Sequence, residues 1–192
     1  DNIMEKFEVL CDNDDIILYK NNIRNNLNEN LEKYIFKFNC EEDINQESLI
    51  EIIKNKQLFD LIHNINEKII SEYKTLENNT FFIRIKEINL DEDEIDDKLN
   101  IFLCFKENNM EESNDNIKIN YKNILYEDSN KIYKQINFDE FDIKCEKMNN
   151  KIFVTVNLEM KINTLNYSLI DNDSIMIVLK VLFKNLKEYL MP

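Results

Sequence analysis

The sequence predicts an α+β fold: N-terminal antiparallel helices, then an antiparallel sheet of five or six strands, and a long C-terminal helix packed on that sheet. Three observations predict it. Apolar residues recur at helical spacing in residues 1–77, alternate with polar residues in residues 78–165, and form a dense apolar run in residues 166–192. These three parts are expected to make a single compact unit of 192 residues.

The first third of the chain has helical periodicity. Apolar side chains at every fourth position predict one helix there, at Ile23, Leu27, Leu31 and Ile35. The end of this helix is ambiguous, because Tyr34, Phe36 and Phe38 alternate as they would in a short strand. Ser48 suits the N-cap of a second helix. A third apolar stripe follows at Leu58, Leu61, Ile62, Ile65, Ile69, Tyr73 and Leu76, and the short connections favour antiparallel neighbours.

From residue 81 onward the apolar period changes to two. Alternation in residues 81–85, 101–105 and 117–121 predicts three strands, and residues 132–138 predict a fourth. The clearest pattern is a hairpin in residues 141–162, where Asn149 and Asn150 can adopt the positive φ that its turn needs. Its second strand is expected to bury one face, formed by Ile152, Val154, Val156, Leu158, Met160 and Ile162.

The C-terminal helix is predicted to begin at a cap provided by Asp173 or Ser174. Its first half is apolar nearly all round, so we expect both faces of the helix to be buried against other parts of the structure. The sheet covers one side, and we expect a partner subunit on the other. The dimer interface is therefore assigned to Ile177, Val181 and Lys184 on the helix and to Val154, Val156 and Leu158 on the last strand.

Composition argues against several classes of function. With 38 acidic and 24 basic residues, the net charge is −14, which repels nucleic acid. A chain without glycine has no glycine-rich loop to cradle a phosphate. No apolar run is long enough to span a bilayer. From the net charge we expect no nucleic acid as partner, and from the lack of such a run we expect no membrane. His63 has no assignable nucleophile, so no catalytic residue is assigned and the protein is not expected to be an enzyme.

The cysteines and the acidic residues do not predict a metal site. Cys11, Cys40, Cys104 and Cys145 lack C-x-x-C spacing, and free thiols in a reducing cytosol are favoured over two disulfides in a secreted chain. An EF-hand loop beginning in the acidic residues 91–97 would need Gly at its sixth position and Glu at its twelfth. Asp96 and Phe102 stand there instead. No metal or other cofactor is expected.

Several short stretches occur in an order that is also found in a known protein family. An apolar segment in residues 7–11 leads into Asn13 and Asp14, and Phe36-Lys37-Phe38 precedes an acidic stretch in residues 41–43. A hairpin in residues 141–162 and a helix in residues 173–190 close the chain. In this order the chain resembles the alpha subunit of the F-actin capping protein, which has a Leu-x-Asn-Asp segment, a Phe-Lys-Phe strand and a closing hairpin and helix. The Trp-Arg-Ser-x-Trp strand of that family has no counterpart here.

This resemblance implies a cytoplasmic, cytoskeletal protein that caps the barbed ends of actin filaments. It would regulate filament growth as one half of a dimer, either with a beta-type subunit or with itself. The family binds actin through basic residues in a mobile tail that follows its C-terminal helix. No such tail is expected here, because the sequence stops at Pro192, directly after the predicted helix. The nearest candidates for that role are Lys180, Lys184 and Lys187.

A ligand carrier is the alternative interpretation. An antiparallel sheet wrapped round a long apolar C-terminal helix is also the helix-grip arrangement of lipid-transfer domains. That arrangement places two helices between its first and second strands, whereas three helices are predicted here before the sheet. The position of the helices relative to the strands therefore discriminates between the two interpretations.

Overall fold

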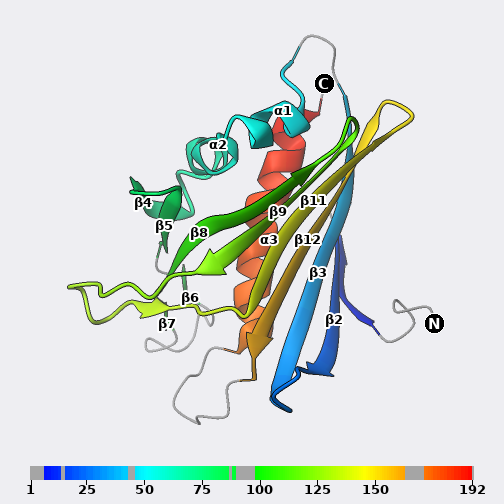
Figure 1. Ribbon diagram of the computed structural model, residues 1–192. Helices are drawn as coiled ribbons and strands as arrows, with labels where there is room; N and C mark the ends of the chain where they lie inside the picture. Colours follow the sequence, from blue (N-terminus) through cyan, green and yellow to red (C-terminus); the bar gives the residue numbers. More distant parts are fainter. Residues whose placement is uncertain are drawn as a thin grey trace.

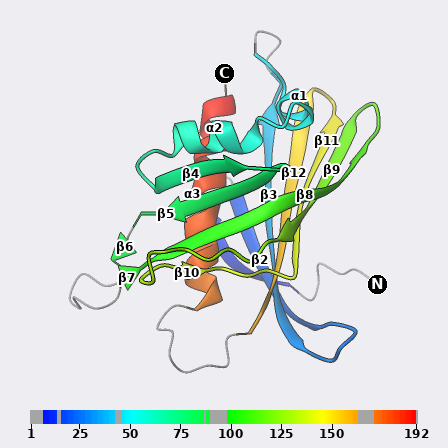
Figure 2. The ribbon, with the colours of Figure 1, turned by 60° about the vertical axis from the view of Figure 1, so that its left-hand side comes forward.

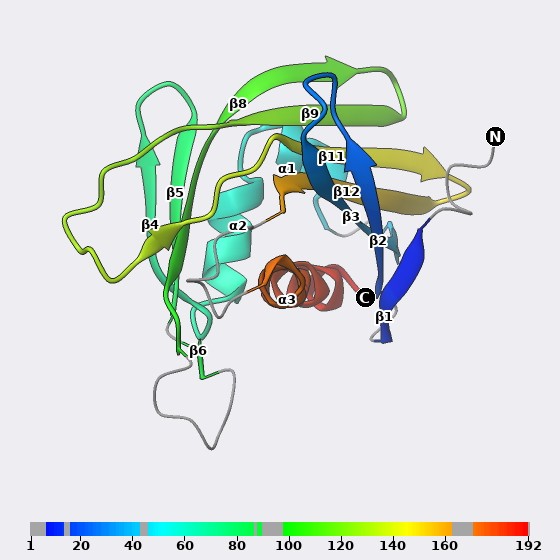
Figure 3. The ribbon, with the colours of Figure 1, turned by 90° about the horizontal axis from the view of Figure 1, so that it is seen from below.

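A curved sheet wrapped around one long helix forms the body of the protein (Figure 1). The computed structural model describes residues 7–13, 16–42, 46–86, 88–89, 98–162 and 171–191. Within them, ten strands form the main sheet, and the helix α3 (Asn172–Leu190) runs along its concave side. Figure 3 shows α3 end-on, with the sheet curving past it on three sides.

Three strands begin the chain: β1 (Glu8–Asn13), β2 (Ile16–Arg24) and β3 (Asn30–Glu41). Two short helices follow, α1 (Leu49–Lys54) and α2 (Leu58–Ile65). The other strands of the main sheet are β4 (Ile70–Leu76), β5 (Thr80–Ile85), β8 (Ile101–Glu112), β9 (Asn116–Asn123), β10 (Lys134–Gln135), β11 (Glu140–Met148) and β12 (Lys151–Lys161). A separate small sheet pairs β6 (Ile88–Asn89) with β7 (Lys98–Leu99).

Strands from the two ends of the chain meet in the middle of the main sheet. The order is β1-β2-β3-β12-β11-β9-β8-β5-β4, and β10 pairs in parallel with β8. β3 and β12 pair antiparallel along their whole length, from Leu31 opposite Lys161 to Glu41 opposite Lys151. This pairing joins segments more than 100 residues apart in the chain. Such a non-local contact cannot be predicted from the sequence pattern of either segment alone.

The helix predicted over residues 23–35 is wrong, because this segment forms the β2–β3 hairpin. The side-chain Oδ1 of Asn25 accepts a hydrogen bond of 3.0 Å from the backbone N–H of Leu27, and Asn28 has a φ of 59°, so a turn forms here. Leu27, which was part of the predicted apolar stripe, is 78% exposed. Pairing with β12 instead buries alternate residues of β3, as its competing strand pattern requires.

The helix predicted over residues 58–76 ends early. α2 stops at Ile65, and after a short turn the chain continues as β4, which pairs with β5. The spacing of Ile69, Tyr73 and Leu76 fits a helix, but antiparallel pairing with β5 from Ile70 to Leu76 makes this segment a strand. The predicted fold class is therefore corrected: three strands precede the helices, and the main sheet has ten strands instead of five or six.

Several of the predicted elements are confirmed, and the strands predicted over residues 81–85, 101–105 and 117–121 are present within β5, β8 and β9. The β11–β12 hairpin turns at Asn149 and Asn150, which have φ of 51° and 63°, so asparagine takes the role of the missing glycine. Ser48 caps α1 by accepting a hydrogen bond from a backbone N–H. α3 is also present, but its N-cap is Asp171, whose carboxylate accepts from the N–H of Ser174 at 2.8 Å.

One predicted strand is shorter than expected, and some predicted features fall outside the described residues. The strand expected in residues 132–138 is reduced to β10. The acidic turn in residues 91–97, together with residues 14 and 43 of the capping-protein resemblance, lies outside the described residues. None of the described helices combines the length and the apolar character that a membrane span needs.

Candidate functional site

The concave face of the sheet packs directly on α3 (Figure 3). The ring of Phe183 on α3 lies 5.9 Å from the ring of Phe36 on β3. The buried apolar residues of α3 are Ile175, Met176, Leu179, Leu182, Phe183, Leu186 and Leu190. α2 lies across α3 near the C-terminal end of that helix, as Figure 2 shows, and completes the enclosure.

An enclosed cavity, which we call the chamber, lies where the sheet, α2 and α3 meet. Its volume is about 30 Å³. All of its lining residues are apolar: Phe59, Ile62, Ile83, Leu103, Phe105, Phe141, Leu158, Leu179, Leu182 and Phe183. A cavity of this size has room for about one water molecule, but a buried water needs polar partners that this lining does not offer. The chamber is therefore a small dry gap in a region otherwise filled by side chains.

Phe59 on α2 packs into this region against four aromatic rings of the sheet. Its ring lies 4.8 Å from the ring of Phe105 and 5.3 Å from that of Phe81, which are on β8 and β5. It also lies 5.4 Å from Tyr121 on β9 and 6.4 Å from Phe141 on β11. Edge-to-face and tilted contacts of this kind stabilise aromatic clusters beyond their buried area. One side chain of α2 thus occupies the space between four strands.

Asn66, at the C-cap of α2, attaches this helix to α3. It is 1% exposed, and its Nδ2 donates to the carbonyl of Ile62 at 2.8 Å and to that of Leu182 on α3 at 3.3 Å. Its Oδ1 accepts a hydrogen bond of 2.7 Å from Nδ2 of Asn185, also on α3. Buried polar groups are costly unless they are bonded, so these three bonds hold the end of α2 in one position.

Titratable groups in the core around the chamber are held neutral. Burial raises the pKa of the Tyr121 phenol and of the Cys145 thiol well above their ordinary values. Burial also raises the pKa of Cys40 to about 11. Because the nucleophilic or basic forms do not accumulate near pH 7, these groups contribute packing and not reactivity.

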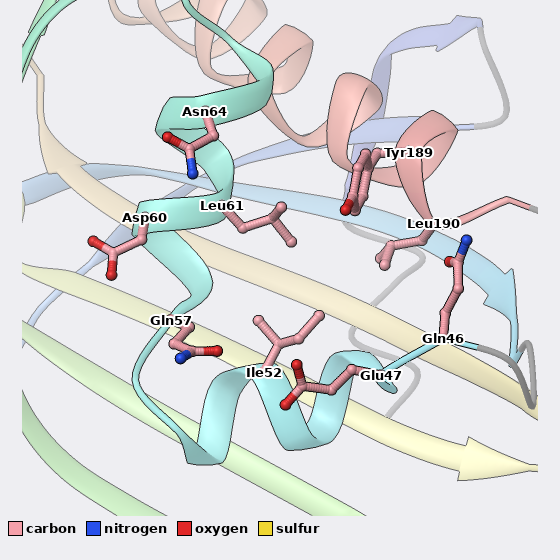
Figure 4. Close-up of a pocket in the computed structure, with 9 residues that line it drawn as sticks. All are labelled: Gln46, Glu47, Ile52, Gln57, Asp60, Leu61, Asn64, Tyr189 and Leu190. Carbon is pink, nitrogen blue, oxygen red and sulfur yellow. The ribbon is translucent and has the colours of Figure 1, made fainter.

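A second hollow, which we call the outer groove, lies on the other side of α2. It has a volume of about 450 Å³ and is lined by Gln46, Glu47, Ile52, Gln57, Asp60, Leu61, Asn64, Tyr189 and Leu190. Figure 4 shows these side chains coming from α1 and the segment before it, from α2, and from the last turn of α3. α2 therefore separates two spaces, because Phe59 and Ile62 face the chamber while Asp60, Leu61 and Asn64 face the outer groove.

The sequence also offers a histidine, four cysteines and many acidic residues as possible reactive or metal-binding groups. His63 stacks on Tyr73 with ring centroids 5.0 Å apart. The four cysteines, all within the described residues, are free thiols. In the described part of the chain, no group of three or more His, Cys, Asp or Glu side chains is placed to hold a metal ion.

The residues assigned to a dimer interface lie in different environments. On β12, Val154, Val156 and Leu158 are at most 2% exposed and belong to the core of this same chain. On α3, Ile177 is 45% exposed, and Val181 and Lys184 are half-buried. Their role in contacts with another chain stays a prediction.

The lysines named as actin-binding candidates are not gathered on one surface. Lys180 and Lys187 are 4% and 8% exposed, whereas Lys184 is half-buried and lies 3.9 Å from Glu188. The ammonium of Lys180 donates to the backbone carbonyl of Asn13 at 3.4 Å, which ties α3 to the edge strand β1.

Sequence reasoning missed the two residues of α2 that matter most here. The predicted apolar stripe does not include Phe59, although this residue lies three positions before Ile62 and so shares its helix face. Asn66 gave no signal, because an asparagine in a chain with 32 of them is not conspicuous. Only its burial against α3 makes it stand out.

The order of elements defines the class of fold. If the first two strands, β1 and β2, are set aside, the sheet begins with β3, and α1 and α2 lie between β3 and the next strand in the chain, β4. β3 lies beside the last strand and β4 lies at the far edge, so the two helices cross the concave face together with α3. This is the helix-grip arrangement, and the alternative interpretation of the sequence is confirmed at the level of fold.

Comparison with known proteins agrees with this fold. The human StarD13 (DLC2) lipid transfer and protein localization domain matches with a TM-score of 0.59 at 9% identity, covering 97% of this chain and 89% of that one. Human StAR-related lipid transfer protein 5 matches with a TM-score of 0.58 at 8% identity, covering 99% and 86%. Major latex-like protein 151 from Panax ginseng matches with a TM-score of 0.52 at 13% identity, covering 84% and 99%. Neither a sequence-family model nor a curated protein sequence matches the chain.

The resemblance to the capping-protein alpha subunit is therefore wrong. The similar structures are StAR-related lipid transfer domains and a latex-like protein, and not capping proteins. The actin barbed end and a beta-type subunit as partners, and a cytoskeletal location, lose their basis together with it.

Proposed function

We propose that the protein binds a hydrophobic, lipid-like small molecule between the sheet and α3. The observation that carries this proposal is the chamber, whose ten lining residues are all apolar and come from the sheet, α2 and α3. Ligand sites are typically concave and predominantly apolar, and this is the apolar hollow of a helix-grip fold. Two of the similar structures are named for lipid transfer, which supports the same class of ligand.

The chamber is closed in this structure. Sites for drug-sized ligands have volumes of roughly 300–1,000 Å³, whereas the chamber has about 30 Å³. A ligand therefore has to displace side chains, and the layer best suited to move is α2. This helix has eight residues, and it carries both Phe59 and Ile62 out of the chamber if it swings away.

The ends of α2 suit such a movement. Lys56, between α1 and α2, has a φ of 60°, a conformation that costs a non-glycine residue about 1–2 kcal/mol. This strained residue lies at one end, and the Asn66 hydrogen bonds to α3 lie at the other. We propose that ligand entry breaks the Asn66 contacts with α3 and turns α2 about the segment around Lys56.

Binding without catalysis is the simplest activity for this site. The residues that line the chamber present no acid, base or nucleophile. The nearby phenol and thiols are held neutral by burial, as described above. We therefore propose a carrier or sensor of the ligand and not an enzyme.

Photo-crosslinking tests the proposal on the unmodified protein. A fatty acid with a diazirine near the end of its chain is added, irradiated, and located by peptide mass spectrometry. Labels are expected on residues 103–105 and 179–183, and excess unlabelled fatty acid should suppress them. Labels confined to the outer face of the sheet, for example around Asn120 and Asp142, would exclude the chamber as the binding site. Mass spectrometry of lipids extracted from the purified protein identifies the natural ligand.

A further inference from the structure

A lysine and a cysteine from opposite ends of the chain meet at the edge of the main sheet. Nζ of Lys180 on α3 donates to Sγ of Cys11 on β1 at 3.1 Å. Lys180 is 4% exposed, although its side chain carries an ammonium group. Within the described residues, the other partners of this ammonium are the backbone carbonyl of Asn13, at 3.4 Å, and Oδ1 of the same residue. The ammonium is therefore enclosed, and it points at the thiol.

A β-bulge turns Cys11 toward α3. The pairing of β1 with β2 shifts its register between Val9 and Cys11, so Leu10 has no partner in β2. Adjacent residues of a regular strand point to opposite faces, whereas Leu10 and Cys11 both pack against the core. Cys11 lies opposite Leu18, which is fully buried. The bulge thus places the thiol on the side of β1 where α3 lies.

The thiol has a defined orientation in this contact. Sγ of Cys11 donates a hydrogen bond to Oδ1 of Asn13 at 3.2 Å, so its proton points at the asparagine and a lone pair of the sulfur accepts from Lys180. A partly exposed thiol beside a cationic side chain is the environment in which protein cysteines react with oxidants. Cys11 and Lys180 therefore form a pair of nucleophiles in direct contact.

The other three cysteines have a different environment. Cys40, Cys104 and Cys145 are at most 4% exposed, and burial raises the pKa of each of these thiols. Cys11 is half-buried on an edge strand. A small oxidant in solution can thus reach Cys11, while the core encloses the other three thiols.

We propose that Cys11 and Lys180 form a reversible sulfenamide crosslink when the protein meets hydrogen peroxide. The sulfur of Cys11 first attacks peroxide, whose O–O bond breaks. One oxygen joins the sulfur as sulfenic acid, and the other leaves as water. Nζ of Lys180 then releases a proton to solvent and attacks the sulfur. The S–N bond forms, the S–O bond breaks, and the oxygen leaves as water with a second proton from Nζ. The sulfur loses two electrons in total, and peroxide gains them.

The crosslink would fix the edge strand β1 to α3. It joins residues 169 positions apart, so it restricts the unfolded chain as a disulfide does and stabilises the folded state. A small thiol such as dithiothreitol reverses it by attacking the sulfur and releasing the amine. This inference is independent of the proposed function, because no ligand of the chamber takes part.

Peptide mass spectrometry of the unmodified protein, before and after hydrogen peroxide, tests the inference. We expect a crosslinked pair of peptides that contain Cys11 and Lys180, lighter than the sum of the two by two hydrogen atoms. Dithiothreitol should remove it. In untreated protein, iodoacetamide should alkylate Cys11 about tenfold faster than the other cysteines, or more. Sulfenic or sulfinic acid on Cys11 without any crosslinked pair would overturn the inference, and so would a crosslink from Cys11 to another lysine.

Variants show whether the amine of Lys180 is needed. Lys180→Arg keeps the positive charge but removes the amine, so Cys11 should proceed to sulfinic acid without a crosslink. Lys184→Arg, one turn further along α3, is the matched control and should leave the yield of the Cys11–Lys180 crosslink unchanged. An equal loss of crosslink in both lysine variants would contradict a specific role of Lys180.

Thermal unfolding gives a second readout that does not require Lys180 to be replaced. Peroxide treatment should raise the melting temperature of the unmodified protein, and dithiothreitol should return it to the starting value. Cys11→Ser changes a half-buried position by one atom and should abolish both the crosslink and the rise. A rise that persists in Cys11→Ser would show that another oxidation causes it, and the inference would fail.

Discussion

The ring of Phe59 on α2 lies 4.8 Å from the ring of Phe105 on β8, edge to face at 65°. This contact closes the space between the sheet and α3, because Phe59 lies against aromatic residues of four strands at once. A helix of eight residues therefore carries the side chain that packs against all four of these strands.

Replacing Phe59 with alanine should open the chamber. We expect Phe59→Ala to lower the free energy of unfolding by about 3–5 kcal/mol, because a buried aromatic ring leaves a cavity. Apolar cavities of this kind stay dry and can bind benzene, so adding benzene should restore part of the stability. Urea unfolding with and without benzene measures both effects.

Leu61→Ala is the matched control on the same helix. Leu61 faces the outer groove, so this change should give a smaller loss and no stabilisation by benzene. If Phe59→Ala does not fold, Phe59→Leu gives the same comparison at smaller volume change. A variant that folds with an enlarged chamber but gains nothing from benzene would contradict the idea that the chamber accepts an apolar ligand.

Asn66→Ala should loosen α2. The change removes the bonds to Ile62 and Leu182 and leaves the amide of Asn185 without its acceptor, at a cost of about 1–3 kcal/mol. Amide hydrogen exchange in residues 58–65 should speed up more than exchange in β11 and β12, since local opening of α2 becomes easier. Asn64→Ala, at an exposed position of α2, should leave exchange unchanged. Uniform acceleration throughout the protein would mean that Asn66 stabilises the whole fold and not α2 in particular.

The two faces of β12 should respond differently to truncation. Leu158 is 2% exposed and faces α3, so Leu158→Ala should cost about 2–5 kcal/mol. Thr155 is half-buried on the opposite face, and Thr155→Ala should cost less than about 1 kcal/mol. Thermal and urea unfolding measure both. Equal losses would indicate that the outer face of the sheet is covered as well.

Stability should fall in alkaline solution. Burial raises the pKa of Cys40 from 9.0 to about 11, and burial also raises the pKa of Tyr121 above its ordinary value. In the unfolded chain these groups lose their protons first, so the unfolded state binds fewer protons and the free energy of unfolding decreases with pH. The contribution of Cys40 is fully present below pH 9 and is lost as pH rises through about 11, where the loss is about 2 kcal/mol.

Urea unfolding at pH 8 and at pH 10.5 measures this slope. Cys40→Ala and Tyr121→Phe should each make the decrease smaller, since each removes a group that ionises only on unfolding. Val154→Ala also removes buried volume but no titratable group, so it should keep the wild-type slope. A slope that is unchanged in Cys40→Ala would show that the thiol ionises equally in both states.

The sequence alone determined the parts of the fold that depend on local pattern. The β11–β12 hairpin was predictable because strict alternation and a two-asparagine turn agree with each other, and no helix buries such a pattern on one face. The dense apolar run of α3 and the Ser48 cap of α1 were equally readable. Charge and composition also excluded phosphate-binding loops, because these need glycine.

Only the tertiary structure decided the rest. Residues 23–35 have spacing that suits a helix and a strand alike, and pairing of β3 with β12, a segment more than 100 residues away, selects the strand. The chamber depends on the same long-range geometry, since Phe59 meets Phe81, Phe105, Tyr121 and Phe141 only after the sheet has curved around α3. Local sequence specifies which residues are apolar, but which of them become neighbours is specified by backbone pairing between distant segments.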